Sequence, residues 1–260
     1  MTRVDRMPAV FIGHGSPMNA LEHNRFTEAW TTFGASIPRP RAIVAVSAHW
    51  YINATAVTAM ESPRVIHDFY GFPQALFDVD YPVPGSPAVA DEVIEALSPH
   101  WVGRDVDSWG IDHGTWSVLA HMFPDASVPV VQLSLDATKS FSDHFQLGAC
   151  LARLRESGIL VLASGNVVHN LGRIAWGRRD FGEDWAVEFD GAVRHIMTSD
   201  PAALCDVEAH SCFDLAVPTP DHFLPLLYLA GMADRQGTSA EVLVGGCELG
   251  SLSMASFVLR

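Results

Sequence analysis

Continuous apolar runs alternate along the chain with segments of helical periodicity. Four runs rich in alanine, valine, isoleucine and leucine predict β-strands, and they cover residues 9–13, 42–47, 129–135 and 159–164. Strands that are covered on both faces lack the regular apolar–polar alternation of half-exposed strands, and these runs lack it as well. The pattern therefore predicts strands in the interior of a sheet.

Segments with an apolar face at helical spacing separate these strands. In residues 87–97 that face is formed by Val89, Val93, Ile94 and Leu97. The other segments that are predicted to be helical are 19–33, 115–122, 142–156, 185–197 and 222–233. Alternating strands and helices predict an α/β fold, a single-domain three-layer sandwich with a mostly parallel or mixed central sheet and helices on both of its faces.

The remaining long segments are predicted to be connections. Residues 241–259 read as extended segments joined by a turn that contains glycine, and residues 62–86 form a long loop rich in proline and glycine. Long ordered loops in compact domains often serve as lids or pocket walls. Because no linker, repeat or low-complexity tract interrupts the pattern, residues 1–260 are predicted to form one domain.

Composition excludes several classes of function. The chain has 260 residues with 16 Lys and Arg against 30 Asp and Glu, which gives a formal charge of −14. Such an acidic chain lacks the basic face that nucleic acids and anionic membrane surfaces require. Lys139 is the only lysine, and no GK[ST] sequence follows a glycine-rich loop, so the chain is not a P-loop nucleotide enzyme.

The cysteines and the first residues indicate the compartment. Residues 1–8 have no apolar segment typical of a signal peptide behind them, and no apolar run is long enough to cross a bilayer. No two cysteines form a CxxC pair; they are Cys150, Cys205, Cys212 and Cys247. We therefore expect reduced thiols in a cytoplasmic protein.

Three of the 12 histidines follow predicted strands. His14 lies in GHGSP, His49 in SAHW and His169 in ASGNVVHN. Open α/β sheets bind ligands beyond the carboxyl ends of their strands, so these imidazoles are predicted to meet at one edge and to form a metal site. His222 lies at the start of a predicted helix with Asp221 as a possible cap, and its spacing leaves its distance from that edge open.

Aromatic side chains near these histidines are candidates for binding a flat ligand. Residues 67–72 bring several rings close together, and Trp50 is next to His49. We predict His67, Phe69, Tyr70 and Trp50 as substrate-binding residues, with packing of the loop as the alternative. The other histidines are expected to be surface or capping residues; they are His23, His100, His121, His144, His195 and His210.

Eight motifs follow one another along nearly the whole chain. They are GHGSP around His14, SAHW around His49, HDFYGFP at 67–73, YPVPGSP at 81–87, DHGTW at 112–116, SGNVVHNL at 164–171, DHFLPLLY at 221–228 and GSLSMASF at 250–257. In this order they resemble the class III, LigB-like extradiol ring-cleavage dioxygenases. Within that class they are most similar to the subgroup called 4,5-DOPA dioxygenase extradiol.

The resemblance implies a mononuclear metal site. The ligand positions of the family fall on His14, His49 and His222, and His169 falls on a position that is either a further ligand or the acid/base. His113 falls on a second histidine of the pocket, which would steady developing charge or bind the substrate. The alternative for His113 is a helix-capping or backbone-bonded role.

The implied reaction inserts both atoms of O₂ into a small, DOPA-like catechol and opens its ring. One divalent metal per chain is implied, with Fe(II) expected for activity and Zn(II) as an ion that purified protein can carry. The expected partners are a catechol and O₂, without nucleic acid or membrane, in a monomer or small homo-oligomer. Two alternatives are a zinc-dependent hydrolase, for which an HExxH motif is missing, and a non-enzymatic binding protein on the same fold.

Overall fold

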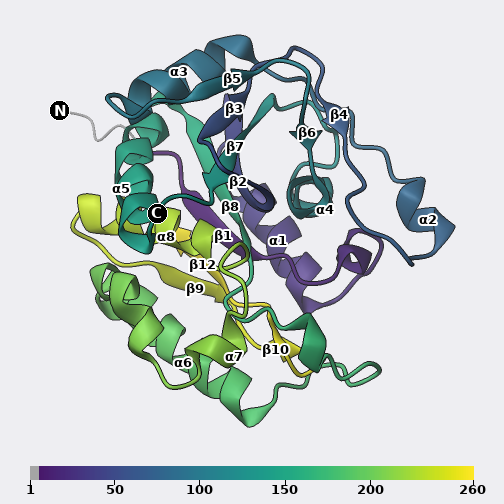
Figure 1. Ribbon diagram of the computed structural model, residues 1–260. Coiled ribbons are helices and arrows are strands. Elements are labelled where there is room, and N and C mark those ends of the chain that lie inside the picture. Colours follow the sequence, from purple (N-terminus) through teal and green to yellow (C-terminus); the bar gives the residue numbers. More distant parts are fainter. Residues whose placement is uncertain (1–5) are drawn as a thin grey trace.

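An eight-stranded mixed sheet runs through the centre of the computed structural model, which describes residues 6–260 (Figure 1). Its strands lie in the order β5-β3-β7-β2-β8-β1-β12-β9. The four central strands, β7 (Val130–Asp136), β2 (Ala42–Ile52), β8 (Ile159–Gly165) and β1 (Ala9–Gly13), are parallel. The outer strands are β5 (Gly103–Asp105), β3 (Ala56–Thr58), β12 (Ser256–Leu259) and β9 (Glu241–Val244).

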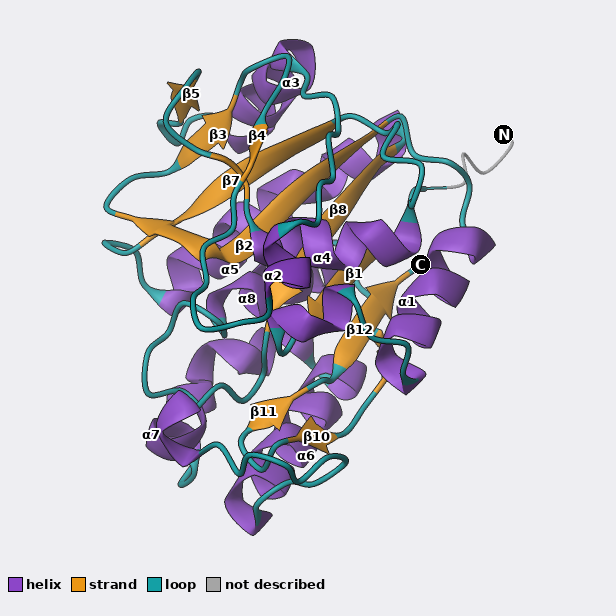
Figure 2. Cartoon of the chain, turned by 90° about the vertical axis from the view of Figure 1, so that its right-hand side faces the viewer, coloured by secondary structure: helices purple, strands orange, loops and turns teal. Residues whose placement is uncertain are grey.

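Helices cover both faces of this sheet (Figure 2). One face carries α1 (Arg25–Ser36) and α4 (His113–Met122), and the short α2 (Gln74–Phe77) lies on the same side. The opposite layer contains α3 (Pro87–Leu97), α5 (Phe141–Leu151), α6 (Asp184–Ser199), α7 (Phe213–Ala216) and α8 (Leu224–Arg235). The predicted α/β sandwich with a mixed central sheet is confirmed.

Short elements complete the chain. Two small two-stranded sheets pair β4 (Arg64–Val65) with β6 (Gly110–Ile111) and β10 (Cys247–Glu248) with β11 (Leu252–Ser253). Four 3₁₀ helices span Pro17–Ala20, Ala152–Ser157, Leu171–Arg173 and Pro201–Ala209. Within residues 6–260 no helix is both long and apolar enough to cross a membrane.

Each face of the sheet has its own hydrophobic core. Along β1, Ala9 and Phe11 belong to the core beneath α5 and α8, whereas Val10 and Ile12 belong to the core beneath α1 and α4. Successive side chains of a strand point to opposite faces, so a fully apolar strand fills both cores. This explains why the central strands are continuous apolar runs in the sequence.

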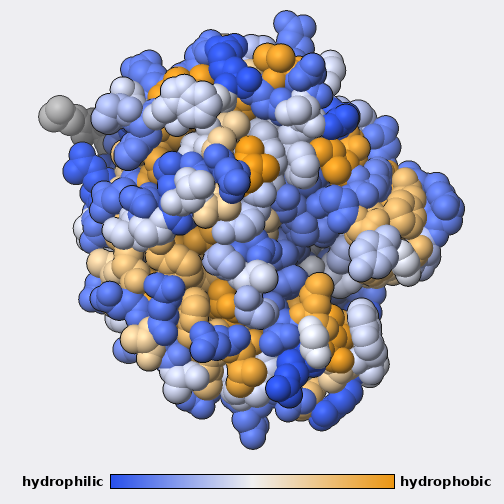
Figure 3. Space-filling view, in the orientation of Figure 1, coloured by the Kyte–Doolittle hydropathy of each residue, from blue (hydrophilic) through white to orange (hydrophobic). Residues whose placement is uncertain are grey.

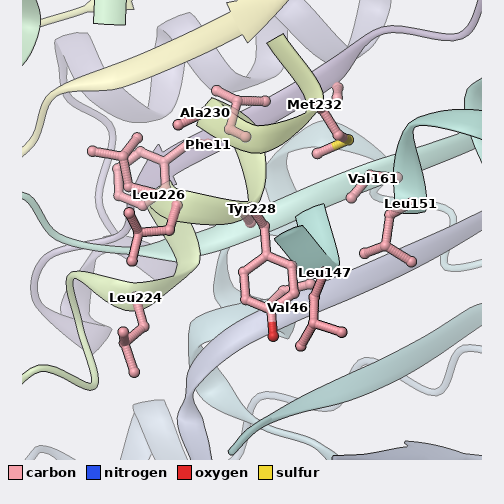
Figure 4. Packing of buried hydrophobic residues seen from close by; sticks show 14 of the residues in the cluster. Phe11, Val46, Leu147, Leu151, Val161, Leu224, Leu226, Tyr228, Ala230 and Met232 are labelled. Carbon is pink, nitrogen blue, oxygen red and sulfur yellow. The ribbon is translucent and has the colours of Figure 1, made fainter. Parts of the chain in front are cut away.

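The packing of α5 and α8 against the sheet illustrates the larger core (Figure 4). Leu147 and Leu151 of α5 and Tyr228 of α8 are fully buried beside Val46 and Val161 of the central strands. Burying a leucine side chain contributes about 1.5–3 kcal/mol to the free energy of unfolding. A rigid body of this kind holds the carboxyl ends of the strands in fixed positions.

Several predicted boundaries are wrong. The predicted helix at 19–33 is two elements, because Asn24 caps a new helix by accepting hydrogen bonds from the backbone N–H groups of Phe26 and Thr27. The predicted helix at 142–156 changes to a 3₁₀ helix at Ala152. Strand β2 continues to Ile52, so His49 lies inside the strand rather than beyond it.

Three further predictions concern the C-terminal part of the chain and its first residues. The helix predicted at 222–233 begins at Leu224, so its predicted cap, Asp221, lies outside the helix. The extended segments predicted at 241–259 are confirmed as β9 to β12. Residues 1–5, which form part of the segment considered for a targeting signal, lie outside the described residues.

Candidate metal centre

Five imidazoles gather at the carboxyl ends of the central strands. His14 directly follows β1, His49 lies in β2, His113 is the first residue of α4, His169 lies in the loop after β8, and His222 lies in the turn before α8. His49 sits where the pairing of β2 with β7 is irregular, between Val46 and Tyr51. The predicted meeting of His14, His49 and His169 at one edge is confirmed, and His113 and His222 join them.

Three of the rings form a nearly equilateral triangle. The ring centroid of His14 lies 5.2 Å from that of His49 and 5.4 Å from that of His222, and those of His49 and His222 are 5.0 Å apart. A metal–nitrogen bond of about 2.1 Å puts each ring centroid about 3.2 Å from the ion, so rings at tetrahedral angles have centroids about 5 Å apart. The spacing of the three rings is therefore compatible with three imidazoles on one ion.

His113 faces the same point as His14 and His49. One ring nitrogen from each of these three residues lies within 4.8 Å of the other two, so the three can hold one ion. The two Nε2 atoms of His14 and His49 are 3.3 Å apart, and the ring centroids of His49 and His113 are 3.9 Å apart. The cluster thus offers more imidazole nitrogens than a three-histidine site needs.

Asp68 holds two of the imidazoles at once. One carboxylate oxygen accepts hydrogen bonds from Nδ1 (2.8 Å) and from the backbone N–H (3.1 Å) of His113, and the other accepts one from Nδ1 of His49 (2.9 Å). A carboxylate only accepts, so both Nδ1 atoms carry the proton. The ring nitrogen of His49 and of His113 that remains for a metal or a ligand is therefore Nε2.

His222 and His14 are held in a similar way by other groups. The Asp221 carboxylate accepts a hydrogen bond from Nδ1 of His222, so Asp221 orients this imidazole instead of capping α8. Nδ1 of His14 lies 3.0 Å from the Ser164 hydroxyl. Each predicted ligand of the triangle thus has a polar partner on Nδ1, and Nε2 is the nitrogen that remains to bind a metal.

His169 differs from the other four because it is stacked on His222. The two ring centroids are 3.5 Å apart and the ring planes are tilted by only 4°. An imidazole binds a metal through a lone pair in its own plane, so an ion in the plane of His222 lies roughly one stacking distance outside the plane of His169. This arrangement favours the acid/base role of His169 over the alternative role as a ligand.

Two glycines allow the chain to approach this closely. A Cβ atom on Gly114 of α4 would lie 2.7 Å from Oγ of Ser47 and 2.8 Å from the His49 ring. A Cβ atom on Gly165 would lie 2.2 Å from the backbone oxygen of His222. Any other residue at either position would push α4 away from His49 or the His222 turn away from β8.

Burial and mutual repulsion keep most of the cluster neutral. Burial, together with the charges of neighbouring imidazoles, lowers the pKa of His14 well below its usual value. Burial lowers the pKa of His222 to about 4 and that of His169 to about 2. Burial also lowers the pKa of His49, but the hydrogen bond to Asp68 and the negative charges of Asp112, Asp68 and Asp221 together outweigh it, so the pKa of His49 is raised. Neutral imidazoles are the form that binds metal.

The residues predicted to bind substrate lie in different places. The Phe69 ring stands edge-on to His113 with centroids 5.4 Å apart. His67 packs against Phe69 and Trp116 and lies 2.9 Å through Nε2 from the backbone oxygen of Val79. Trp50 is buried and stacked on Trp109, and Tyr70 is 92% exposed. Of the four residues predicted to bind substrate, only Phe69 thus packs with its ring against one of the five imidazoles.

One histidine that was expected at the surface is in the core. His144 of α5 is fully buried, and its Nδ1 atom lies 3.1 Å from the Tyr228 hydroxyl. His121 is partly buried, and its Nε2 atom lies 2.8 Å from the backbone oxygen of Asn19. The surface expectation for His144 is therefore wrong, because α8 covers its side of α5.

Sequence reasoning missed two residues of the centre. The motif HDFYGFP contains Asp68 without indicating its role, and the sequence predicts Asp221 only as a possible helix cap. A carboxylate beside a histidine in sequence, as in His67–Asp68 and Asp221–His222, was the available signal.

The face of the molecule drawn in Figure 3 is hollowed to the right of its centre, and hydrophilic residues form the floor of the hollow.

A comparison with known protein families shows to which family the chain belongs. The profile described as "Catalytic LigB subunit of aromatic ring-opening dioxygenase" matches residues 8–254. The chain belongs to the LigB family of aromatic ring-opening dioxygenases. The predicted resemblance and the predicted class of enzyme, an oxidoreductase that opens aromatic rings with O₂, are confirmed. LigB dioxygenases use a metal, and the histidine cluster is able to bind one ion.

Individual relatives of this LigB-family enzyme agree over almost their whole length. A protein of Escherichia coli (strain K12) named 4,5-DOPA dioxygenase extradiol is 50% identical, over 96% of this chain and 94% of its own. A protein of Beta vulgaris with the same name is 32% identical, over 95% of this chain and 94% of its own. The crystal structure of an uncharacterized E. coli K12 protein matches with a TM-score of 0.86 and 45% identity, over 98% of this chain and 100% of that one.

Proposed function

We propose that this LigB-family enzyme is an Fe(II)-dependent extradiol dioxygenase acting on a small, DOPA-like catechol. The observation that carries the proposal is the triangle of His14, His49 and His222, whose size suits one ion. The names of the E. coli and Beta vulgaris relatives support DOPA or a close analogue as the substrate. The ring bond that breaks joins a hydroxyl-bearing carbon to the adjacent ring carbon that carries no hydroxyl group, and the product keeps both atoms of O₂.

The proposed ligands are His14, His49 and His222, each through Nε2. When bound, Fe(II) would bring the catechol and O₂ together and let electron density pass from the ring to O₂, which Zn(II) cannot do. Zn(II) is nevertheless an ion that these imidazoles would retain during purification. Asp68, Asp221 and Ser164 orient the three rings from the opposite side, through Nδ1.

His169 is the proposed acid/base. Its ring is stacked on His222 beside the proposed ligands, so one of its nitrogens can accept a phenolic proton from the arriving catechol. The same nitrogen can return that proton later in the turnover. The stacking keeps the ring beside the metal ligands without making it one of them.

His113 and Phe69 are proposed to position the substrate. Asp68 keeps the proton of His113 on Nδ1, so Nε2 of His113 faces the cluster as a hydrogen-bond acceptor for a catechol hydroxyl. Phe69 packs edge-on against His113 and provides an apolar wall for the substrate ring. His67 supports this wall from behind, through its contacts with Phe69 and Trp116.

A reconstitution experiment tests the proposal. Metal-free protein is loaded with Fe(II) without oxygen and mixed with DOPA and O₂, and both the yellow ring-opened product and the O₂ consumed are measured. We expect one O₂ per product, no product with Zn(II) alone, and no product from His14→Gln. His100→Gln changes an exposed histidine and is the matched control, with wild-type turnover expected. Equal turnover with Zn(II) would contradict the proposal.

We also propose that the enzyme works in the cytoplasm. All four cysteines are free thiols, and Cys212 and Cys247 are buried. Free thiols persist where the surroundings are reducing. Imaging of a tagged protein in its native cell tests this location, and secretion into an oxidising compartment would contradict it.

A further inference from the structure

We propose that Ser164 is a positioning residue that fixes the proton of His14 on Nδ1 and so leaves the Nε2 lone pair of His14 free for the metal. The inference rests on the proposed metal centre, but its first test uses metal-free protein. The Ser164 Oγ atom lies 3.0 Å from Nδ1 of His14 and 2.5 Å from the backbone oxygen of Gly114. Ser164 is fully buried, so bulk water does not compete for either contact.

Counting protons gives the direction of both hydrogen bonds. The Ser164 hydroxyl has a single hydrogen to donate, and the backbone oxygen of Gly114 can only accept. The hydrogen therefore goes to Gly114. At the contact with His14 the Ser164 oxygen must then accept, so Nδ1 of His14 is the donor and carries the proton. A neutral imidazole with its proton on Nδ1 has its lone pair on Nε2.

Ser164 achieves this differently from the aspartates of the site. The carboxylates of Asp68 and Asp221 accept hydrogen bonds only, so each fixes the proton of its histidine without help. A serine hydroxyl can donate or accept, and a third group has to decide between the two. Here that group is the backbone oxygen of Gly114, the second residue of α4. The first turn of α4 therefore determines which ring nitrogen of His14, the proposed ligand that follows β1, carries the proton.

The position of Ser164 makes this three-way contact possible. Ser164 lies near the end of β8 and is in register with Ile12 of β1 on one side and Ser47 of β2 on the other. The loop after β1 therefore brings His14 over the end of β8, while α4 approaches from one face of the sheet. The hydroxyl joins the strand, the helix and the ligand at one buried point.

Ser256 provides a matched control. It is also fully buried, on β12 beside β1, and its hydroxyl accepts a hydrogen bond from the backbone N–H of Gly13 (3.1 Å) and donates one to the backbone oxygen of Met254 (3.2 Å). Ser256→Ala and Ser164→Ala each remove one buried hydroxyl with two hydrogen bonds. Only Ser164→Ala removes a partner of an imidazole.

The first measurement is the ring-nitrogen spectrum of His14 in metal-free protein labelled with ¹⁵N-histidine, at about pH 7.5. Long-range ¹H–¹⁵N correlations distinguish a proton on Nδ1 from one on Nε2, and His14→Gln identifies the signals. We expect the Nδ1–H form in wild-type protein, in Ser256→Ala and in Ser164→Thr, which keeps the hydroxyl. We expect Ser164→Ala to shift His14 wholly or partly to the Nε2–H form.

Two outcomes of this spectrum would overturn the inference. One is an Nε2–H form of His14 in the wild-type protein, which needs no variant to be folded. The other is a persistent Nδ1–H form in Ser164→Ala. A shift of equal size in Ser256→Ala would show a general loss of structure and would count against Ser164 as well.

The second measurement is the affinity for Zn(II) in competition with a chelator. Loss of a group that orients a metal-binding histidine costs about 10–100-fold in metal affinity, so we expect that loss for Ser164→Ala and less than about 2-fold for Ser256→Ala. Equal losses in the two variants would overturn the role of Ser164. Wild-type protein that binds no Zn(II) would overturn the proposed metal centre instead, and the His14 spectrum would still decide the tautomer.

Discussion

The two sides of the histidine cluster are held in different ways. On one side, Asp68 binds Nδ1 of both His49 and His113, so a single carboxylate fixes two rings. On the other side, Asp221 fixes His222, and His169 is held by stacking on that ring. Groups that carry a metal need fixed lone pairs, whereas a group that moves protons needs one nitrogen that is not committed.

In the proposed function this difference distinguishes the metal ligands from the residue that transfers protons, although all five side chains are imidazoles. His14, His49 and His222 each have a partner on Nδ1, and their ring centroids form a triangle with sides of 5.0 to 5.4 Å. The ring of His169 lies in a plane nearly parallel to that of His222, and we therefore propose that it does not bind the same ion. The predictions below change one side of the cluster at a time, beginning with the largest expected effect.

The strongest contrast is expected from His169→Gln. If His169 only transfers protons, this variant binds Fe(II) as well as the wild type, while kcat falls by about 10²–10⁴-fold. His222→Gln, which changes its stacking partner, is expected to lose metal as well as activity. Metal content by elemental analysis and kcat from O₂ consumption are measured on the same samples. Loss of metal in His169→Gln would make His169 a ligand and remove the contrast.

The next largest effect is expected on the side of the cluster that Asp68 holds. Asp68→Asn keeps the size of the side chain but removes one of the two carboxylate acceptors, so one of His49 and His113 loses its orientation. Metal affinity should fall by about 10–100-fold, as measured by chelator competition. Asp78→Asn changes an exposed aspartate that accepts a hydrogen bond from the Gln74 side chain, and it serves as the control. Equal affinities in the two variants would show that Asp68 does not orient the ligands.

The third, smaller effect is the loss of stability in acid that a buried histidine, His144, is expected to cause. Burial lowers the pKa of His144 to about 4, whereas an unfolded histidine has a pKa of about 6.5. The unfolded state therefore binds more protons in this window, and stability that is complete above about pH 6.5 is lost as the pH falls toward 4. From about pH 7.5 to pH 5.0 this amounts to about 2 kcal/mol.

Urea unfolding of metal-free wild-type protein and of His144→Gln at these two pH values measures the effect. The variant should lose about 2 kcal/mol less of its free energy of unfolding on acidification than the wild type. His195→Gln changes an exposed histidine on α6 and should behave like the wild type. An identical loss in His144→Gln would assign the acid sensitivity to other groups, the metal-site histidines among them.

The smallest expected effect compares two neighbouring rings. Phe69 contacts His113, whereas the next residue, Tyr70, is 92% exposed. Phe69→Ala removes an apolar wall and should raise KM for the catechol by about 10-fold, which corresponds to about 1.4 kcal/mol. Tyr70→Ala should change KM by less than about 2-fold. A larger effect of Tyr70 would indicate that the loop closes over the substrate.

The strands and the end-of-strand histidines could be predicted because their signals are local. Residues 9–13 are five consecutive buried positions, and the predicted strand has the observed bounds of β1. His14 follows that strand directly, so the carboxyl-end rule for α/β sheets placed it at the site. The helix predicted at 87–97 also has the observed bounds, because its apolar face spans the whole segment, and in the structure Ser86 caps its first turn.

The rest depends on contacts between distant parts of the chain. Asp68 acts on His113, 45 residues away, and no pattern around either residue shows that pairing. His144 lies in the polar sequence SDHFQ and was expected at the surface, but α8 covers it in the fold. The role of Asp221 was misjudged because α8 begins later than its periodicity suggested, at Leu224.

The most direct test of the account is the position of a single ion in crystals of Fe(II)-loaded protein, located by anomalous scattering at the iron edge. We predict one peak about 2.1 Å from the Nε2 atoms of His14, His49 and His222, with His169 beyond bonding distance. A peak bound by His169, or by His113 in place of His222, would contradict the assignment of ligands and proton carriers. An empty cluster in iron-loaded, active enzyme would contradict the metal centre itself.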